Sequence, residues 1–159
     1  MLHPLVLTTG VWAAGFVRNL VWDKTHEKNS PTPLNDIDLV YFNANDCNEE
    51  TDRDYESYLK SISDYPWSVK NQVRMHMRNM DAPYSSTADA MSYWVEVETA
   101  IGVRLSKGHD LEFVAPFGLK SLFNNTVTIN SKRRKPKDFD ERVNGKKWLE
   151  HWPNLKVND

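Results

Sequence analysis

Two aspartates, two positions apart, are the residues of this sequence best suited to chemistry. Asp36 and Asp38 open the segment DIDLVYF, whose remaining members are apolar or aromatic. These residue types, followed by the turn-forming NAND, predict a strand over residues 36–42, in which both aspartates point to the same face. Two carboxylates so close repel each other unless a cation lies between them. Mg²⁺ accepts one or two carboxylates with phosphates and water, so we expect Asp36 and Asp38 to bind Mg²⁺ or Mn²⁺.

A glycine upstream of this strand is suited to binding phosphate. Gly15 ends a predicted turn over residues 13–15 that leads into a short helix. Glycine lets a backbone approach a phosphate closely, and the N-terminus of the helix offers free N–H groups and a positive dipole end. Arg18 in that helix adds a planar fork of donors for phosphate or ribose oxygens. An Asp-x-Asp pair alone is usually a solvated face, but with this turn it predicts a metal–triphosphate site.

A second polar face is predicted on the segment WSVKNQVRMHM, residues 67–77, which alternates as a strand does. One face carries Lys70, Gln72, Arg74 and His76. This face is either solvated or a polar wall of the nucleotide pocket, and we assign Lys70 and Arg74 to nucleotide binding. His76 is interpreted as a structural histidine, with a base for the acceptor hydroxyl as the alternative. Asn71 lies on the opposite face and fits a hydrogen-bonded core residue.

Two further groups of basic residues are candidates for binding anions. Arg104 falls in a predicted strand near the sheet centre, where an arginine needs a carboxylate or phosphate partner. We count it as a nucleotide-binding candidate, with Asp36 or Asp38 as its partner when no nucleotide is bound. The run KRRK, residues 132–135, is interpreted as a mobile loop, with contact to an RNA backbone as the alternative.

The remaining elements mix helices and strands. Further helices are predicted over residues 49–62, 86–94, 116–123 and 139–152, and further strands over residues 99–105 and 111–115. Trp148 and Trp152, four apart, are expected to pack the last helix down. The mixture predicts an α+β or α/β fold with a single mixed β-sheet packed with helices. The 159 residues suit one domain, residues 1–159.

The composition limits which binding partners and which cellular compartment are expected. The net charge of −2 gives no global reason to expect DNA or an anionic membrane as a partner. Cys47 is the one cysteine, so no internal disulfide is possible. The N-terminus lacks the basic region and cleavage site of a signal peptide, and no stretch is apolar enough to span a bilayer. We therefore expect a cytoplasmic protein.

The segments AGFVRN, residues 14–19, and DIDLVYF together resemble the nucleotidyltransferase superfamily, with its glycine turn followed by Asp-hydrophobic-Asp. The head domain of class II CCA-adding enzymes and poly(A) polymerases is the most similar form. Through GFVRNLVWD, WSVKNQVRMH, ETAIGVRL, APFGLKSLF and HWP, the chain also resembles a family of small bacterial nucleotidyltransferase-like proteins. The resemblance implies a nucleotidyltransferase head fold, with metal ligands at Asp36 and Asp38 and the triphosphate at Gly15, Arg18 and Asn19.

The sequence departs from the CCA-type motif in two places and from many members of the superfamily in a third. Ala14 replaces the first glycine, and Asn19 replaces an aspartate. The third carboxylate that many superfamily members carry on the next core strand is absent from residues 67–77, which leaves Glu98 or Glu112 as candidates. Motifs for base selection and tRNA-gripping domains are not found, so CCA addition is not expected.

Three functions remain open at this point. The first is metal-dependent transfer of a nucleotidyl group from an NTP to an unknown acceptor, for which RNA is one possibility. The second is a nucleotide-binding or sensing module that does no chemistry, and the missing third acid favours it. The third is a protein-interaction domain that keeps only the fold, and the intact aspartate pair argues against it.

Overall fold

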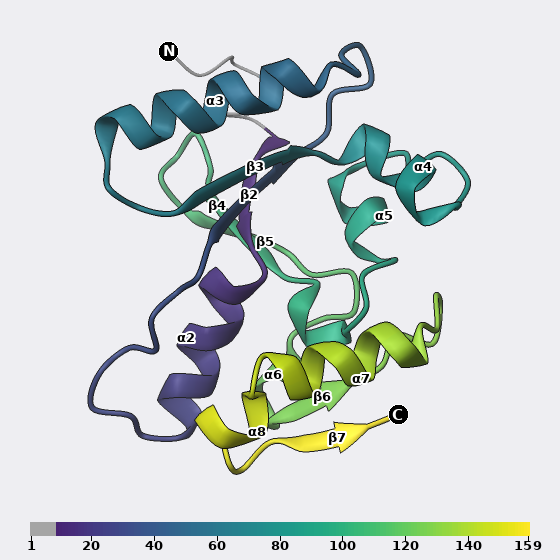
Figure 1. The fold of residues 1–159 in the computed structure, drawn as a ribbon. Coiled ribbons are helices and arrows are strands. Elements are labelled where there is room, and N and C mark those ends of the chain that lie inside the picture. Colours follow the sequence, from purple (N-terminus) through teal and green to yellow (C-terminus); the bar gives the residue numbers. More distant parts are fainter. Residues whose placement is uncertain (1–8) are drawn as a thin grey trace.

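A mixed five-stranded sheet forms the centre of the protein, whose computed structural model describes residues 9–159 (Figure 1). The strand order is β3-β2-β1-β4-β5, with β2 and β3 parallel and the other neighbours antiparallel. The strands are β1 (Val11–Ala13), β2 (Ile37–Tyr41), β3 (Trp67–Asn71), β4 (Gly102–Leu105) and β5 (Leu111–Val114). The predicted α+β class, with a mixed sheet packed with helices, is confirmed. Residues 1–8, where no signal peptide is expected, lie outside the described residues.

Helices and a second small ladder surround this sheet. The α-helices are α2 (Gly15–Thr25), α3 (Glu49–Ile62), α4 (Met75–Asn79), α5 (Thr87–Met91), α6 (Lys120–Phe123), α7 (Pro136–Gly145) and α8 (Trp148–His151). Two short 3-10 helices are η1 (Gln72–Arg74) and η2 (Val97–Thr99). A parallel pair, β6 (Thr126–Thr128) with β7 (Lys156–Asn158), was not predicted. Across residues 9–159, no helix is long and apolar enough to cross a membrane.

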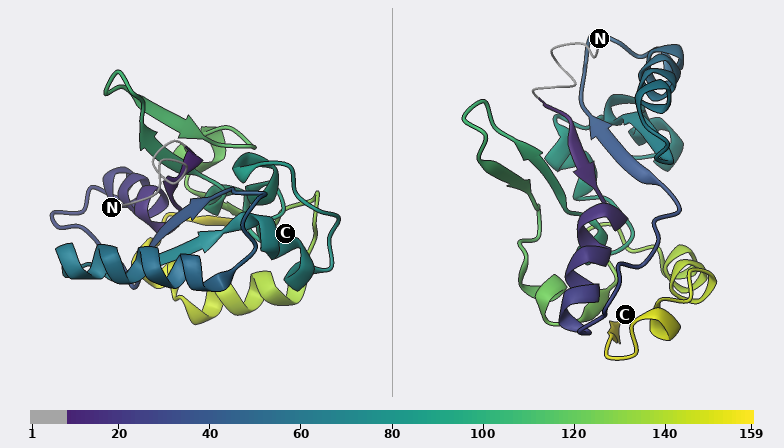
Figure 2. Two further views of the ribbon diagram at one scale, coloured as in Figure 1. Left: turned by 90° about the horizontal axis from the view of Figure 1, so that it is seen from above. Right: turned by 90° about the vertical axis from the view of Figure 1, so that its left-hand side faces the viewer.

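Alternation along β2 divides its side chains between two environments. Leu39 and Tyr41 join Leu59 of α3 and Val69 of β3 in one buried cluster. Val40 belongs to a different cluster, formed with residues of β1 and α5. Helix α3 therefore covers the β2–β3 end of one sheet face, while the β4–β5 hairpin projects at the far edge (Figure 2). Asp38, two residues before Val40, lies on the face that α3 leaves open.

A cluster of tryptophans fastens the C-terminal segment to α2. The Trp22 ring meets the Trp148 and Trp152 rings edge to face, with centroids 5.7 and 5.1 Å away. The Trp152 indole N–H also donates to the Asp23 carboxylate over 2.8 Å. The predicted packing role of Trp148 and Trp152 is confirmed. The predicted helix over residues 139–152 is in fact two helices, because the left-handed backbone of Lys147, with a φ of 52°, interrupts the helix.

Several other predicted elements also differ from the observed ones. The helices expected over residues 86–94 and 116–123 are the shorter α5 and α6. Residues 11–13 form β1, where only a turn and a helix were expected. The strand predicted over residues 99–105 begins as η2 and becomes a strand only at Gly102. The strand predicted over residues 67–77 ends at Asn71, whose side chain accepts from the Val73 N–H and caps η1. By contrast, α3 has its predicted bounds, and Ser86, one of the two serines expected to cap the helix (Ser85 or Ser86), caps α5.

The early end of β3 sends Arg74 into the protein interior. Its guanidinium forms a buried ion pair with Asp52 of α3. Asp52 also accepts from the Tyr41 hydroxyl over 2.7 Å and from the Asn71 N–H over 3.1 Å. Burial, with that hydrogen bond, raises the pKa of Tyr41, so its hydroxyl stays a donor. Asn71 is the hydrogen-bonded core residue predicted, with its amide bonded to two backbone carbonyls.

Replacing Arg74 by methionine should lower the free energy of unfolding by about 3–5 kcal/mol, because it leaves the buried Asp52 carboxylate without its cation. Urea denaturation measures this change. The matched control is Arg53→Met, which removes the arginine of the exposed Arg53–Glu49 pair on α3, the helix that carries Asp52. For this variant we expect a change under about 1 kcal/mol. Similar losses in the two variants would contradict the structural role given to Arg74.

Candidate functional site

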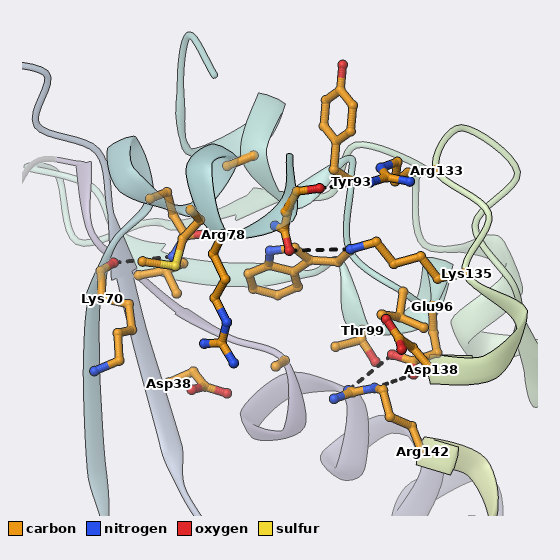
Figure 3. A pocket seen from close by; sticks show the side chains of 18 of the residues that line it. Asp38, Lys70, Arg78, Tyr93, Glu96, Thr99, Arg133, Lys135, Asp138 and Arg142 are labelled. Atoms are coloured by element: carbon orange, nitrogen blue, oxygen red, sulfur yellow. Dashed lines mark hydrogen bonds and ion pairs between the residues drawn. The ribbon is translucent and has the colours of Figure 1, made fainter. Parts of the chain in front are cut away.

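A cavity of about 890 Å³ opens on the sheet face that carries Asp38 (Figure 3). Strands β2 and β3 form one wall, and α4, the chain around residues 93–99 and the start of α7 form the others. Figure 3 shows Asp38 and Lys70 on the strand side, Glu96 and Arg142 facing them, and Arg78 reaching in between. The charged lining residues are Asp38, Lys70, Arg78, Glu96, Arg133, Lys135, Lys137, Asp138, Glu141 and Arg142.

Asp38 is the half-buried member of the predicted carboxylate pair. It lies opposite Ala13 of β1 and beside Ser68 of β3. Asp36 precedes β2 by one residue, is exposed and is not among the residues that line the cavity, but its charge acts on Asp38. Burial and then the negative charge of Asp36 raise the pKa of Asp38, against a hydrogen bond from Ser68. The pair therefore carries uncompensated repulsion that a cation would relieve.

The donor set at this pair fits a hard divalent cation bound together with its substrate. Within residues 9–159, no group of three or more His, Cys, Asp or Glu side chains is placed to hold a metal ion. The chain thus offers two carboxylates, and Mg²⁺ commonly takes its remaining ligands from phosphates and water. Asp36 and Asp38 fit that mode of binding.

The start of α2 lies next to Asp38, because β1 ends at Ala13 opposite it. Ala14 has φ 54° and ψ −123°, a conformation that glycine adopts far more readily than alanine. It is held there by a bond from its N–H to the Ile101 carbonyl, 3.0 Å long. No side chain caps α2 and its first turn holds no acid, so its first N–H groups are free to bind an anion.

Gly15 itself has helical backbone, so its freedom of conformation is not what the turn requires. A Cβ at this position would lie 3.4 Å from the Arg18 Nη2 atom and 3.8 Å from the Asn19 amide. The absence of a side chain at Gly15 therefore leaves space at the helix start, next to the side chains of Arg18 and Asn19. The strained position in the turn is Ala14, one residue earlier.

Arg18 lies beneath the start of the helix rather than in the cavity. Its guanidinium is buried, donates to the Thr99 hydroxyl over 2.8 Å and to the Asn19 side-chain oxygen over 2.9 Å, and stacks over Trp148 at 4.6 Å. Burial lowers its pKa to about 10, which leaves it charged at neutral pH. Arg18 thus acts on the site through its positive charge, and Arg18 and Asn19 together support the start of α2. The contact between Arg18 and Trp148 links this helix start to α8.

The structure brings only some of the other predicted residues to the cavity. Lys70 lines the cavity, whereas Arg74 forms an ion pair with Asp52. Arg104 pairs with Glu112 across the β4–β5 hairpin at 2.7 Å, and not with Asp36 or Asp38. Neither Arg74 nor Arg104 is therefore among the residues that line the cavity, and the expected partnership of Arg104 with Asp36 or Asp38 is replaced by one with Glu112.

The two candidates for a third carboxylate also lie elsewhere. Glu98 is buried and accepts from the hydroxyls of Thr126 and Thr128, each over 2.8 Å. Glu112 is exposed on β5, where it holds Arg104. His76 has its ring Nδ1 atom 2.8 Å from the Val73 carbonyl oxygen, which supports the structural interpretation.

Sequence reasoning missed Glu96, Arg142 and Arg78. Glu96 lines the cavity, is almost fully buried and accepts from the Arg142 Nε atom of α7 over 2.5 Å. Nothing local in the sequence joins residues 96 and 142, so only the fold reveals this pair. Arg78 follows the predicted strand over residues 67–77 and was assigned to no element, whereas α4 carries it to the cavity.

The fold and this arrangement define a nucleotidyltransferase head domain, with an Asp-x-Asp strand beside an uncapped helix start. Residues 1–157 match the protein family described as Nucleotidyltransferase, and the chain belongs to that family. An NMR structure described as revealing a CCA-adding enzyme head domain is 33% identical, with a TM-score of 0.83, over 96% of this chain and 83% of that one. No curated protein matches the chain.

Larger enzymes share the fold at low identity. A CCA-adding enzyme in complex with CTP is 11% identical, with a TM-score of 0.60, over 98% of this chain and 39% of that chain. A tRNA-processing enzyme complex is also 11% identical, with a TM-score of 0.60, over 94% of this chain and 40% of that chain. The chain therefore spans about two fifths of these enzymes, which show the shared fold alone.

Replacing Ala14 by glycine should raise the free energy of unfolding by about 1 kcal/mol. Relief of the strained backbone, worth roughly 1–3 kcal/mol, exceeds the extra flexibility of glycine in the unfolded chain. Thermal and urea unfolding measure the change. Ala88→Gly, on the exposed side of α5, is the control and should lose up to about 1 kcal/mol. A loss at both positions would contradict the strain at Ala14.

Replacing Asp38 by asparagine should raise the melting temperature of the metal-free protein at neutral pH. The pKa of Asp38 lies above its ordinary value of 3.8, so the charged carboxylate opposes folding. The gain should be constant above the pKa in the folded protein, shrink as the pH falls through it, and vanish below 3.8. Melting curves at several pH values measure it. Asp54→Asn, on exposed α3 surface, should show no gain at any pH.

Proposed function

We propose that this protein transfers a nucleotidyl group from a nucleoside triphosphate to an acceptor, with a divalent metal held by Asp36 and Asp38. The observation that carries the proposal is the position of Asp38, between the open cavity and the uncapped start of α2. Membership of the nucleotidyltransferase family supports the same chemistry. Mg²⁺ or Mn²⁺ suits the two carboxylates equally.

The chain's own residues bind and orient the substrates. A divalent metal at Asp36 and Asp38 would supply positive charge to the triphosphate and to the oxygens that attack and leave. The first N–H groups of α2 bind phosphate oxygens, because they have no capping side chain. The acceptor hydroxyl oxygen attacks the α-phosphorus and loses its proton to the medium, and pyrophosphate leaves. Positioning and fixed charge provide most of the rate.

Arg18 is a positioning residue in this scheme, since its donors are used within the protein. By holding Thr99 and stacking on Trp148, it ties the α2 start to η2 and α8. Lys70 lines the cavity from β3, on the side of β2 that faces away from β1.

A nucleotide-sensing module without chemistry is the second candidate function. One specific observation favours it: Glu98 and Glu112 are occupied elsewhere, and the buried Glu96 is held by Arg142. No carboxylate among the described residues is therefore placed as a free third acid. Release of pyrophosphate separates the two functions, because only the transferase breaks the bond to the α-phosphorus.

The deciding experiment is calorimetric titration with ATP, GTP, CTP and UTP, each with and without Mg²⁺ or Mn²⁺. We expect at least one nucleotide to bind only with metal, and Asp36→Asn or Asp38→Asn to weaken it about a hundredfold, since each removes a charged metal ligand. Asp54→Asn is the control for the loss of one negative charge and should bind like the wild type. A well-folded protein that binds none of the nucleotides would refute the site.

A further inference from the structure

We propose that the acceptor carries a phosphate group, which binds a cationic subsite formed by Lys70 of β3 and Arg78 of α4. The inference rests on the proposed nucleotidyl transfer and adds the chemical class of the second substrate. Both side chains line the cavity that Asp38 faces, and Lys135, before α7, adds a third cation on another wall (Figure 3). Lys70 and Arg78 come from separate elements, so the subsite exists only in the folded chain.

Strand order places this subsite on the acceptor side of the reaction. Attacking and leaving oxygens lie roughly in line on opposite sides of the phosphorus. Asp38 is on β2, with β1 and the phosphate-binding start of α2 on one side and β3 with Lys70 on the other. If pyrophosphate leaves toward α2, the acceptor enters from the side of β3 and α4. Lys70 and Arg78 are the cations on those two elements that line the cavity.

Lys70, Arg78 and Lys135 differ from the other basic residues of the wall in having no direct ion pair, although Lys70 and Lys135 act through charge on the more distant Glu56 and Asp81. Arg133 donates to the Asp81 carboxylate over 2.6 Å, and Arg142 pairs with Glu96. Lys137 lies 3.9 Å from Glu141. In the described part of the chain, no carboxylate oxygen lies within 4.0 Å of the charged groups of Lys70, Arg78 or Lys135; Lys135 meets only the neutral Asn79 side chain, at 3.4 Å.

Charge then decides the class of acceptor. Once a metal neutralises the aspartate pair, the described lining residues whose charge has no ion pair are three cations, Lys70, Arg78 and Lys135, and one carboxylate, Asp138 of α7, so their net charge is positive. A cationic acceptor such as an aminoglycoside would meet like charges, whereas phosphate oxygens match lysine and arginine donors. The volume, about 890 Å³, is near the upper end of the roughly 300–1,000 Å³ of ligand sites, so a nucleotide leaves room for part of a second substrate.

The test separates the subsite from the nucleotide site. The protein is first saturated with Mg²⁺ and the α,β-methylene analogue of the nucleotide that binds best, in which the bond to be broken is replaced by carbon. Glycerol 3-phosphate, an RNA tetranucleotide with a free 3′-hydroxyl, glycerol and tobramycin are then titrated. We expect one or both phosphate-bearing probes to bind, and glycerol and tobramycin not to bind.

The double variant Lys70→Gln/Arg78→Gln should weaken the phosphate-bearing probe about a hundredfold, since each of the two charge-assisted contacts is worth about tenfold. Arg134→Gln is the control, an exposed arginine before α7 that does not line the cavity. For the tetranucleotide, the slope of log affinity against log salt should fall by roughly 0.7 per cation removed. The probe that binds more tightly shows whether the phosphate of the acceptor belongs to a small molecule or to an RNA end.

Each remaining outcome has one meaning. Binding of tobramycin or glycerol in place of the phosphate-bearing probes would overturn the inference. So would equal losses in the double variant and in Arg134→Gln. If the nucleotide analogue binds normally and no phosphate-bearing probe does, the subsite is refuted and the nucleotide site stands. If the analogue itself does not bind, the proposed function fails first.

Discussion

The register between β1 and β2 is the constraint on which the site depends. Ala13 lies opposite Asp38, and the chain leaves β1 directly into α2. A shift of one residue would turn Asp38 toward α3 and move the α2 start away from the carboxylates. The register is held by the apolar clusters on both faces, since Leu39 and Tyr41 must meet α3 while Val11 and Val40 meet the opposite cluster. The aspartate pair and the uncapped start of α2 are thus brought together by one strand pairing.

Much of this fold and site follows from local sequence patterns. DIDLVYF predicted the β2 strand and the common face of Asp36 and Asp38, because strand alternation is a property of neighbouring residues. The acidic first turn and apolar stripe of residues 49–62 were sufficient to predict α3. Lys70 was placed correctly for the same reason, since the alternation holds through Asn71.

The errors arise where distant residues decide the outcome. Arg74 continues the polar alternation in sequence, but Asp52 gives its charge a buried partner and the strand ends at Asn71. Arg104 and Glu112 pair across a hairpin, which removes both from the site. Single-domain organisation and cytoplasmic location stay predictions, because no observation here tests them.

The ion pair between Glu96 and Arg142 joins helix α7, near the C-terminal end of the sequence, to the wall of the cavity. Arg142 lies on α7, which the tryptophan cluster and the β6–β7 ladder anchor from positions 148 to 158. Domains tend to fold as units while synthesis runs from the N-terminus. A nascent chain that has already emerged through β5 holds the aspartate pair and the start of α2, yet has no enclosed cavity. Synthesis itself therefore delays the assembly of a competent site until the last elements have left the ribosome.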